Sequence, residues 1–280
     1  MPRYEDEYDN PSRQPRPRSK NTGLLVTLVV VSVIFVVCGG GLIATVFFST
    51  GRVRDAANRI QSNNNLKQIA LGIHNYNDTK NELPNNSFGA DGKPLLSWRV
   101  HILPYVEESA LYQQFKLDEP WDSANNIRLL NQMPKVYAHP RDRHQAGVSV
   151  TYYRGFSSPG AVFEKRPRAS NPAGPIVDGP AVMLKKEDPF NLSSFKDGIS
   201  ETLLVVEAGD PVEWTKPDDL DASPGRPFPA LGGMGWSGNR FNVAFADGSV
   251  KALKPGVPET TLRALVTHSG GEKLPPGWDE

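Results

Sequence analysis

The chain has 280 residues, and its 31 Lys and Arg balance its 31 Asp and Glu, so that the formal net charge is zero. The lack of a basic surplus argues against nucleic acid as a partner, and the single Cys excludes an intramolecular disulfide and a cysteine-based metal site. The length allows a membrane anchor and one domain of about 200 residues, and the 25 Gly and 25 Pro predict many loops in that domain.

Residues 1–22 are predicted to form a disordered cytoplasmic tail, because they are rich in Pro and in charged side chains. The next segment is apolar from Leu24 to Phe48, and no Asp, Glu, Lys or Arg stands between Asn21 and Gly51. An α-helix of this length rises roughly 37 Å, which exceeds the hydrocarbon core of a bilayer, about 30 Å. Residues 23–48 are therefore predicted to form a transmembrane helix.

A cleaved signal peptide is the alternative interpretation of the apolar segment. Gly39, Gly40 and Gly41 could end the apolar core of such a peptide, but apolar residues resume immediately and continue to Phe48. We therefore expect the segment to stay in the protein as an anchor.

Positive charge predicts the orientation of the anchor. Arg and Lys residues cluster before the apolar segment, which favours a cytoplasmic N-terminus. The expected location is the cytoplasmic (inner) membrane, crossed once, with the C-terminal domain outside the cytoplasm. The membrane is then the first predicted partner, and other envelope proteins or a second copy of the chain are the next.

Residues 49–80 are predicted to continue as an extended stalk helix. From Val53 to Tyr76, apolar residues recur at a spacing of three and four, and only the run Asn63 to Asn65 interrupts the pattern. Asn81 and Pro84 are expected to end the helix. Its outer half would pack on a sheet.

Residues 81–280 are predicted to form an extracytoplasmic α+β domain. A strand is expected from Trp98 to Leu103, followed by a helix to about Phe115, and a further helix from Asp122 or Ser123 up to Pro134. The continuous apolar run in residues 201–208 predicts an inner strand. A short helix is expected, capped at Glu259 or Thr260 and ended at Gly270.

The segment FNVAFADGSVKAL predicts a β-hairpin. Asp247 and Gly248 are expected to form a two-residue turn, because Gly tolerates the positive φ that such turns require. A two-residue loop would pair Phe245 with Val250 and Val243 with Ala252. The predicted fold class is thus α+β: an N-terminal transmembrane helix that continues into a long amphipathic helix packed on an antiparallel sheet.

Four motifs in order resemble one known family: NNLKQIALGIHNYND, SWRVHILPYVEESALYQQFKLDEPWDSANN, DGISETLLVVEAGDPVEWTKPDDL and FNVAFADGSVKAL. The chain is similar there to the planctomycete prepilin-type family known as domain of unknown function 1559. The resemblance spans residues 63–272 and implies a pilin-like architecture.

Two departures from the family pattern limit the resemblance. Gly23 is followed by LLVTL rather than by a prepilin cleavage motif, and Ser237 replaces the His of a His-(nine residues)-Asp-Gly signature, so neither prepilin processing nor a role of that His carries over.

Tryptophans beside carboxylates are the candidate ligand-binding residues. Trp98, Trp121, Trp214, Asp218 and Asp219 could bind a sugar through aromatic faces and acidic groups. The alternative is that these tryptophans are large core residues that hold long loops. The acidic run that includes Asp218 and Asp219 could bind Ca²⁺, or it could be a solvated face.

Histidines offer weaker candidates. His74 and Asp78 share a helical face, but they leave the other ligands of a metal unnamed, so that a helix-end polar role is the better interpretation of His74. His139 and His144 are expected in an exposed loop beside two Arg, which would oppose a metal ion. No metal site and no cofactor is therefore predicted.

No motif of a known catalytic class is present in the sequence. The predicted function is that of a non-enzymatic single-pass membrane protein of the cell envelope with a pilin-like or pseudopilin-like domain, in a structural or interaction role. The alternative is a membrane-tethered module that binds a carbohydrate or another small ligand. A hydrolase is the least supported class.

Overall fold

The computed structural model describes residues 21–141, 149–166, 189–232 and 240–278; for residues 21–25 and 34–52 it describes the backbone alone. The chain divides into two compact units, residues 1–53 and residues 54–280. Helix α1, Asn21–Lys80, contributes residues to both units. Over the described residues, no helix combines the length and the apolar character that crossing a membrane requires.

The second unit is built around a four-stranded antiparallel sheet with the order β1-β2-β3-β4. Strand β2 lies between β1 and β3, as its apolar run predicts. The α+β class and the antiparallel sheet are therefore confirmed. The strands are β1 Val150–Arg154, β2 Leu203–Glu213, β3 Phe241–Phe245 and β4 Val250–Leu253.

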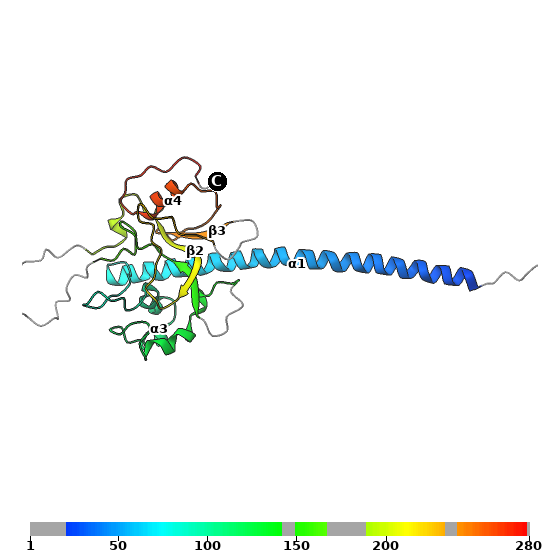
Figure 1. Cartoon of the computed structure of the whole chain (residues 1–280), viewed down its shortest axis with the longest axis horizontal. Coiled ribbons are helices and arrows are strands. Elements are labelled where there is room, and N and C mark those ends of the chain that lie inside the picture. Colours follow the sequence, from blue (N-terminus) through cyan, green and yellow to red (C-terminus); the bar gives the residue numbers. More distant parts are fainter. Residues whose placement is uncertain (1–20, 142–148, 167–188, 233–239, 279–280) are drawn as a thin grey trace, which may run out of the picture. The chain divides into compact units, whose positions relative to one another are not determined.

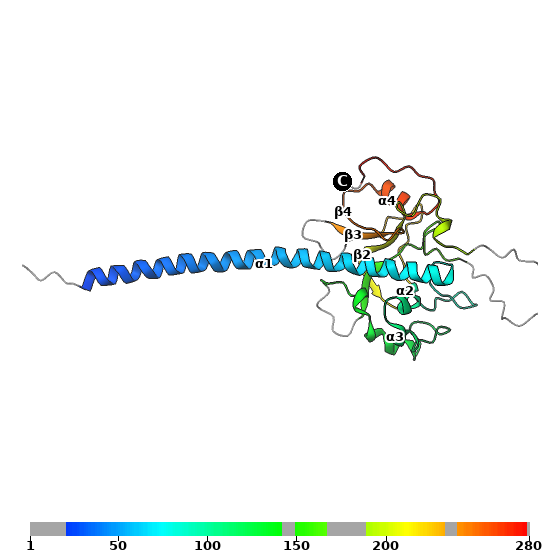
Figure 2. The same ribbon diagram turned by 180° about the vertical axis from the view of Figure 1, so that it is seen from behind.

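Helices cover both faces of this sheet (Figures 1 and 2). On one face, Leu66, Ile69 and Ile73 of α1 are fully buried in a core that also contains Leu204 and Ala244 of the strands, among others. Each such side chain contributes about 1.5–3 kcal/mol when it is removed from water. The predicted apolar stripe is buried only from Leu66 onward. Ile60, an earlier member of the stripe, is 63% exposed.

The second core lies on the other face of the sheet. Phe241, Val243 and Phe245 alternate along β3 toward this face and pack with Leu262 and Leu265 of helix α4, Glu259–Val266. Because successive side chains of a strand point to opposite faces, β3 supplies both cores. Helix α4 begins at Glu259 with Pro258 as its N-cap, one residue before the first predicted cap, and it ends at Val266 rather than at Gly270.

The predicted strand from Trp98 to Leu103 is wrong, because Trp98–His101 is a helical turn, α2, followed by the 3-10 turn η1, Leu103–Tyr105. The Ser97 side chain accepts a hydrogen bond from the Arg99 backbone N–H and caps α2. The two helices expected further on are also shorter, as α3 Ser109–Tyr112 and the 3-10 helix η2 Asn126–Gln132. The remaining 3-10 turns are η3 Lys135–Tyr137 and η4 Leu192–Ser194.

The hairpin between β3 and β4 is present, but its predicted register is wrong by one residue. Val243 pairs with Lys251 and Ala244 with Val250. The loop has three residues, because Phe245 N–H donates to Ser249 O and Gly248 N–H donates to Phe245 O. Gly248 has φ +83°, the conformation that such three-residue loops require at this position.

Candidate functional site

Trp98 and Asp219, two of the predicted ligand-binding residues, meet inside the domain. Trp98 Nε1 donates to Asp219 Oδ1 at 3.2 Å, and the same oxygen accepts from the Gly155 backbone N–H at 3.1 Å. Asp219 Oδ2 accepts from Asn86 Nδ2 at 2.7 Å. Both carboxylate oxygens therefore already have donors from the protein, and Trp98 is fully buried.

Arg99 completes this cluster as a buried cation. Its Nη2 lies 3.3 Å from Asp219 Oδ1, and both side chains are fully buried. Its Nε and Nη2 also donate to the Tyr153 carbonyl oxygen at 2.9 and 2.7 Å, and its Nη1 donates to Ser97 Oγ at 2.6 Å. Burial lowers the pKa of Arg99, and Asp219 opposes this shift. Asp219 is thus the internal counter-ion of Arg99, which leaves it poorly placed to bind Ca²⁺.

Trp214, Trp121 and Asp218 have other partners than the Trp98–Asp219 pair. Trp214 is fully buried and donates its Nε1–H to the Leu130 carbonyl oxygen at 2.9 Å. Trp121 is half-buried, with Lys216 Nζ 5.8 Å from its ring centroid. Asp218 pairs with Lys216 at 3.2 Å and with Arg154 at 2.9 Å. The tryptophans and acidic residues therefore do not converge on one open site.

The Asp247–Gly248 turn contacts helix α1. His74 Nε2 lies 2.9 Å from the Ala246 carbonyl oxygen, and Asp247 Oδ1 accepts from the Ser249 backbone N–H at 2.8 Å. His74 therefore bonds to backbone, but to that of a distant loop rather than of the helix end, because α1 continues beyond it to Lys80. Over the described residues, no group of three or more His, Cys, Asp or Glu side chains is placed to hold a metal ion.

A buried polar network joins α1 to the sheet. Glu207, 1% exposed, accepts from the Asn242 backbone N–H at 2.7 Å, from Asn242 Nδ2 at 3.0 Å and from Ser62 Oγ. Ser62 Oγ also lies 2.7 Å from Tyr153 Oη, and burial raises the pKa of Tyr153. Asn65 donates to the Ala138 carbonyl oxygen, so that the polar interruption in the apolar stripe lies partly inside this interface.

His139 belongs to the same network, and its predicted exposure is wrong: it is 2% exposed, with Nε2 3.6 Å from Glu207 Oε1. His144 and Ser237 lie outside the described residues. The combination of Ser62, His139 and Glu207 differs from a catalytic triad. In a triad the His stands between the Ser and the carboxylate, whereas here Ser62 contacts Glu207 directly.

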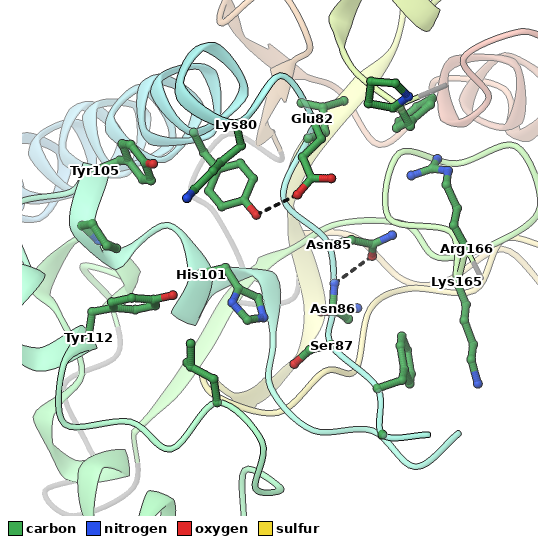
Figure 3. A pocket seen from close by; sticks show the side chains of 18 of the residues that line it. Lys80, Glu82, Asn85, Asn86, Ser87, His101, Tyr105, Tyr112, Lys165 and Arg166 are labelled. Atoms are coloured by element: carbon green, nitrogen blue, oxygen red, sulfur yellow. Dashed lines mark hydrogen bonds between the residues drawn. The ribbon is translucent and has the colours of Figure 1, made fainter. Parts of the chain in front are cut away.

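An open pocket of about 770 Å³ lies near the C-terminal end of α1 (Figure 3). Small-molecule sites typically enclose about 300–1,000 Å³. Its walls come from separate parts of the chain: the last turns of α1, the loop over residues 82–92, the turns around α2 and α3, and the segments next to Arg166 and Phe190. Figure 3 shows Tyr105 and Tyr112 on one side of the pocket and Lys165 and Arg166 on the other.

Tyrosines form one wall of this pocket. The rings of Tyr76 and Tyr105 meet edge to face, with centroids 5.7 Å apart, and Tyr76 Oη donates to Glu82 Oε1 at 3.5 Å. Burial raises the pKa of Tyr76, and Glu82 raises it further. Burial also raises the pKa of Tyr112, with a smaller contribution from Tyr105. The Tyr76 and Tyr112 phenols therefore remain protonated at neutral pH and can donate hydrogen bonds.

Cations form the opposite wall. The Arg166 guanidinium lies 3.4 Å from the centroid of the Phe190 ring and donates to the Val162 and Ala161 carbonyl oxygens. Burial lowers the pKa of Arg166 to about 10, so that it stays charged at neutral pH. Lys165 Nζ lies 4.5 Å from the centroid of the Phe88 ring and donates to the Gly92 carbonyl oxygen at 3.3 Å.

Sequence reasoning missed this pocket. Two of the family motifs contribute residues to its walls, among them Tyr76 and Tyr105, but no pattern predicted that these tyrosines would meet Lys165 and Arg166. Tyr76 and Lys80 are separated from Lys165 and Arg166 by most of the first half of the domain. The one local signal is the run from His101 to Tyr112, where an aromatic or His residue recurs in successive short turns.

The fold and the pocket define a mixed α+β domain with an open aromatic and basic cavity. The family model described as "Protein of unknown function (DUF1559)" matches residues 51–237, so the chain belongs to this family, and the predicted membership of the family is confirmed. Comparisons with curated proteins and with solved structures gave no match.

Proposed function

We propose that this chain is a non-enzymatic, membrane-anchored protein of the cell envelope, with a pilin-like domain that acts in assembly or interaction. The observation that carries the proposal is the packing of the outer part of α1, through Leu66, Ile69 and Ile73, along one face of an antiparallel sheet. A long N-terminal helix on such a sheet is the arrangement that the prepilin-type resemblance implies. The missing cleavage motif at Gly23 favours a protein that keeps its N-terminal segment.

The support for the anchor is the sequence alone. From Asn21 to Gly51 there is no charged side chain, and the basic residues before this segment favour a cytoplasmic N-terminus in the inner membrane. The test is alkaline carbonate extraction of membranes from cells that make the full chain. We expect the protein in the membrane pellet, with its C-terminal domain open to protease only from the extracytoplasmic side.

A matched pair of variants sharpens that test. A Val30→Arg, Ile34→Arg double variant places two charges in the apolar segment, each of which costs about 2.5–3.5 kcal/mol at a helix centre, and should release the protein. Val30→Leu, Ile34→Leu is the control and should stay in the pellet. A wild-type protein that is fully extracted would overturn the anchor.

The proposed role is interaction with other envelope proteins or with a second copy of the chain. Cross-linking in intact membranes, followed by mass spectrometry of the linked species, tests it. We expect links from the domain to itself or to a defined envelope protein. A protein that stays unlinked at every cross-linker length would contradict an assembly role.

The pocket favours a second candidate function, that of a membrane-tethered module for a small ligand. Its volume suits a small molecule, and it combines tyrosines with hydrogen-bonding and charged groups. A thermal-shift screen of the full chain with small glycans and metabolites tests this, because a ligand that binds the folded state raises its melting temperature.

A further inference from the structure

The charges in the pocket are unequal. Among the lining residues that the structure describes, Lys80, Lys165 and Arg166 are cationic, and Glu82 is the single carboxylate. The chain as a whole has no net charge, so this excess is local. A site with cations around a low-dielectric wall concentrates anionic ligands. The pocket therefore favours a ligand with negative charge.

The three cations of the pocket differ in how many hydrogen-bond donors they have left for a ligand. The guanidinium of Arg166 is stacked on Phe190 and donates to two carbonyl oxygens, so that it acts mainly as a fixed charge in the wall. Lys80 is exposed, and Lys165 is exposed with one hydrogen bond to a carbonyl oxygen. A Lys ammonium has three donors, so both lysines retain donors for a ligand.

The aromatic wall indicates what carries the negative charge. Tyr105 and Tyr112 are half-buried, and the face of an aromatic ring is electron-rich. The C–H groups on one face of a sugar ring are slightly positive and fit such a surface, while the phenol hydroxyls can bond the sugar hydroxyls. Both kinds of contact are available on the same wall.

The position of α1 argues against a compact phosphate dianion. Tyr76 and Lys80 belong to the last two turns of α1, whose unpaired carbonyl groups carry partial negative charge. Phosphate sites usually use the opposite end of a helix, where backbone N–H groups point outward. A single negative charge spread over a carboxylate or sulfate, attached to a sugar ring, is more compatible with this end of the helix.

We propose that the pocket binds an acidic saccharide, a sugar ring that bears a carboxylate or a sulfate, with Lys80 and Lys165 contacting the anion and Tyr105 and Tyr112 contacting the ring. This inference rests on the second candidate function, ligand binding. It does not depend on the assembly role.

The test is isothermal titration calorimetry on the full chain in detergent. The probes are trigalacturonate, a sulfated galacto-oligosaccharide, neutral galactotriose and a tetraglutamate peptide. We expect at least one of the two acidic sugars to bind about tenfold or more tighter than the neutral sugar and the peptide, and to weaken as added salt screens the charges. The stronger of the two acidic sugars identifies the anion.

Variants assign the binding to this pocket. Lys80→Gln and Lys165→Gln should each lower the affinity for the acidic sugar roughly 5- to 10-fold. Tyr112→Phe removes the phenol hydroxyl but keeps the ring, and so tests the contribution of the hydroxyl to binding. Lys67→Gln is the matched control, because Lys67 is an exposed lysine of α1 that does not line the pocket. Each variant is checked for an unchanged melting temperature, so that loss of binding is separated from loss of fold.

Other outcomes overturn the inference in distinguishable ways. Equal binding of neutral and acidic sugars, or tighter binding of the peptide, would refute the acidic saccharide and leave a ligand-binding module standing. No binding of any probe, together with no shift in the thermal screen, would refute both. If Lys67→Gln weakens binding as much as Lys80→Gln does, the acidic sugar does not bind in this pocket.

Discussion

His74 Nε2 lies 2.9 Å from the Ala246 carbonyl oxygen, so that the outer part of α1 is joined to the turn between β3 and β4. A carbonyl oxygen only accepts hydrogen bonds, and Nε2 must therefore carry a proton in this contact. The contact links two motifs that are far apart in the sequence.

Replacing His74 should loosen this connection. We expect His74→Ala to lower the free energy of unfolding by about 0.5–1.5 kcal/mol, the usual contribution of one hydrogen bond. His74→Gln keeps an N–H donor and should lose less. Urea unfolding of the full chain, followed by tryptophan fluorescence, measures both. Equal losses in the two variants would show that the bond to Ala246 contributes nothing.

Glu207 should be the least replaceable polar residue of the α1–sheet interface. Glu207→Gln puts an N–H₂ group among the donors of Asn242 and Ser62, and we expect a loss of about 2–4 kcal/mol, since buried donors lose their acceptor. Glu213→Gln, in the same strand but only half-buried, is the control and should stay within about 0.5 kcal/mol. Denaturant midpoints of the two variants give the comparison.

Neighbouring residues Asp218 and Asp219 should respond very differently to the same change. Asp219→Asn leaves the fully buried Arg99 without its counter-ion and should cost about 3–5 kcal/mol. Asp218 is 45% exposed in its pair with Arg154, so Asp218→Asn should cost no more than about 1 kcal/mol. Similar losses in both would mean that Asp219 does not compensate the charge of Arg99.

Gly155 is predicted to tolerate no side chain. A Cβ at this position would lie 2.1 Å from Phe163 Cδ2, and the Phe163 ring is itself stacked on Trp98 with centroids 4.7 Å apart. We expect Gly155→Ala to lower the free energy of unfolding by about 1–3 kcal/mol, because the tightly packed side chains around it have no room to move away from an added methyl group. Gly256→Ala, where no atom lies within 4 Å, is the control and should be close to neutral.

His268 should make stability depend on pH. Burial lowers its pKa in the folded state, and Arg166 lowers it further, so the unfolded chain binds more protons as pH falls. The contribution is therefore favourable above the ordinary His pKa, about 6.5, and is lost as pH falls below it. Wild type should lose more stability between pH 7.5 and 5 than His268→Gln. Parallel pH profiles of the two proteins would refute this.

Local pattern was sufficient for several elements. The outer half of the helix with the apolar stripe from Val53 to Tyr76 was predicted to pack on a sheet, and Leu66, Ile69 and Ile73 of that half are fully buried. The apolar run of residues 201–208 predicted an inner strand, and both of its faces are covered. The Asp247–Gly248 turn was also placed correctly along the chain.

The pocket and the hairpin register required the folded structure. A one-residue difference in loop length changes every cross-strand pair, and it depends on how Phe245, Gly248 and Ser249 bond. The pocket depends on side chains from several separate segments, whose meeting no short motif encodes.

By itself, the sequence determined the α+β class and the buried side of α1, because the periodicity of apolar residues indicates which face of an element is removed from water. Its motifs determined the family. Tertiary structure decided that Trp98 begins a helix rather than a strand, that Asp219 is the counter-ion of Arg99, and that His139 is buried beside Glu207. The reason is physical: a buried charge or polar group is tolerated only where distant residues supply its partners, and those partners appear only when the chain folds.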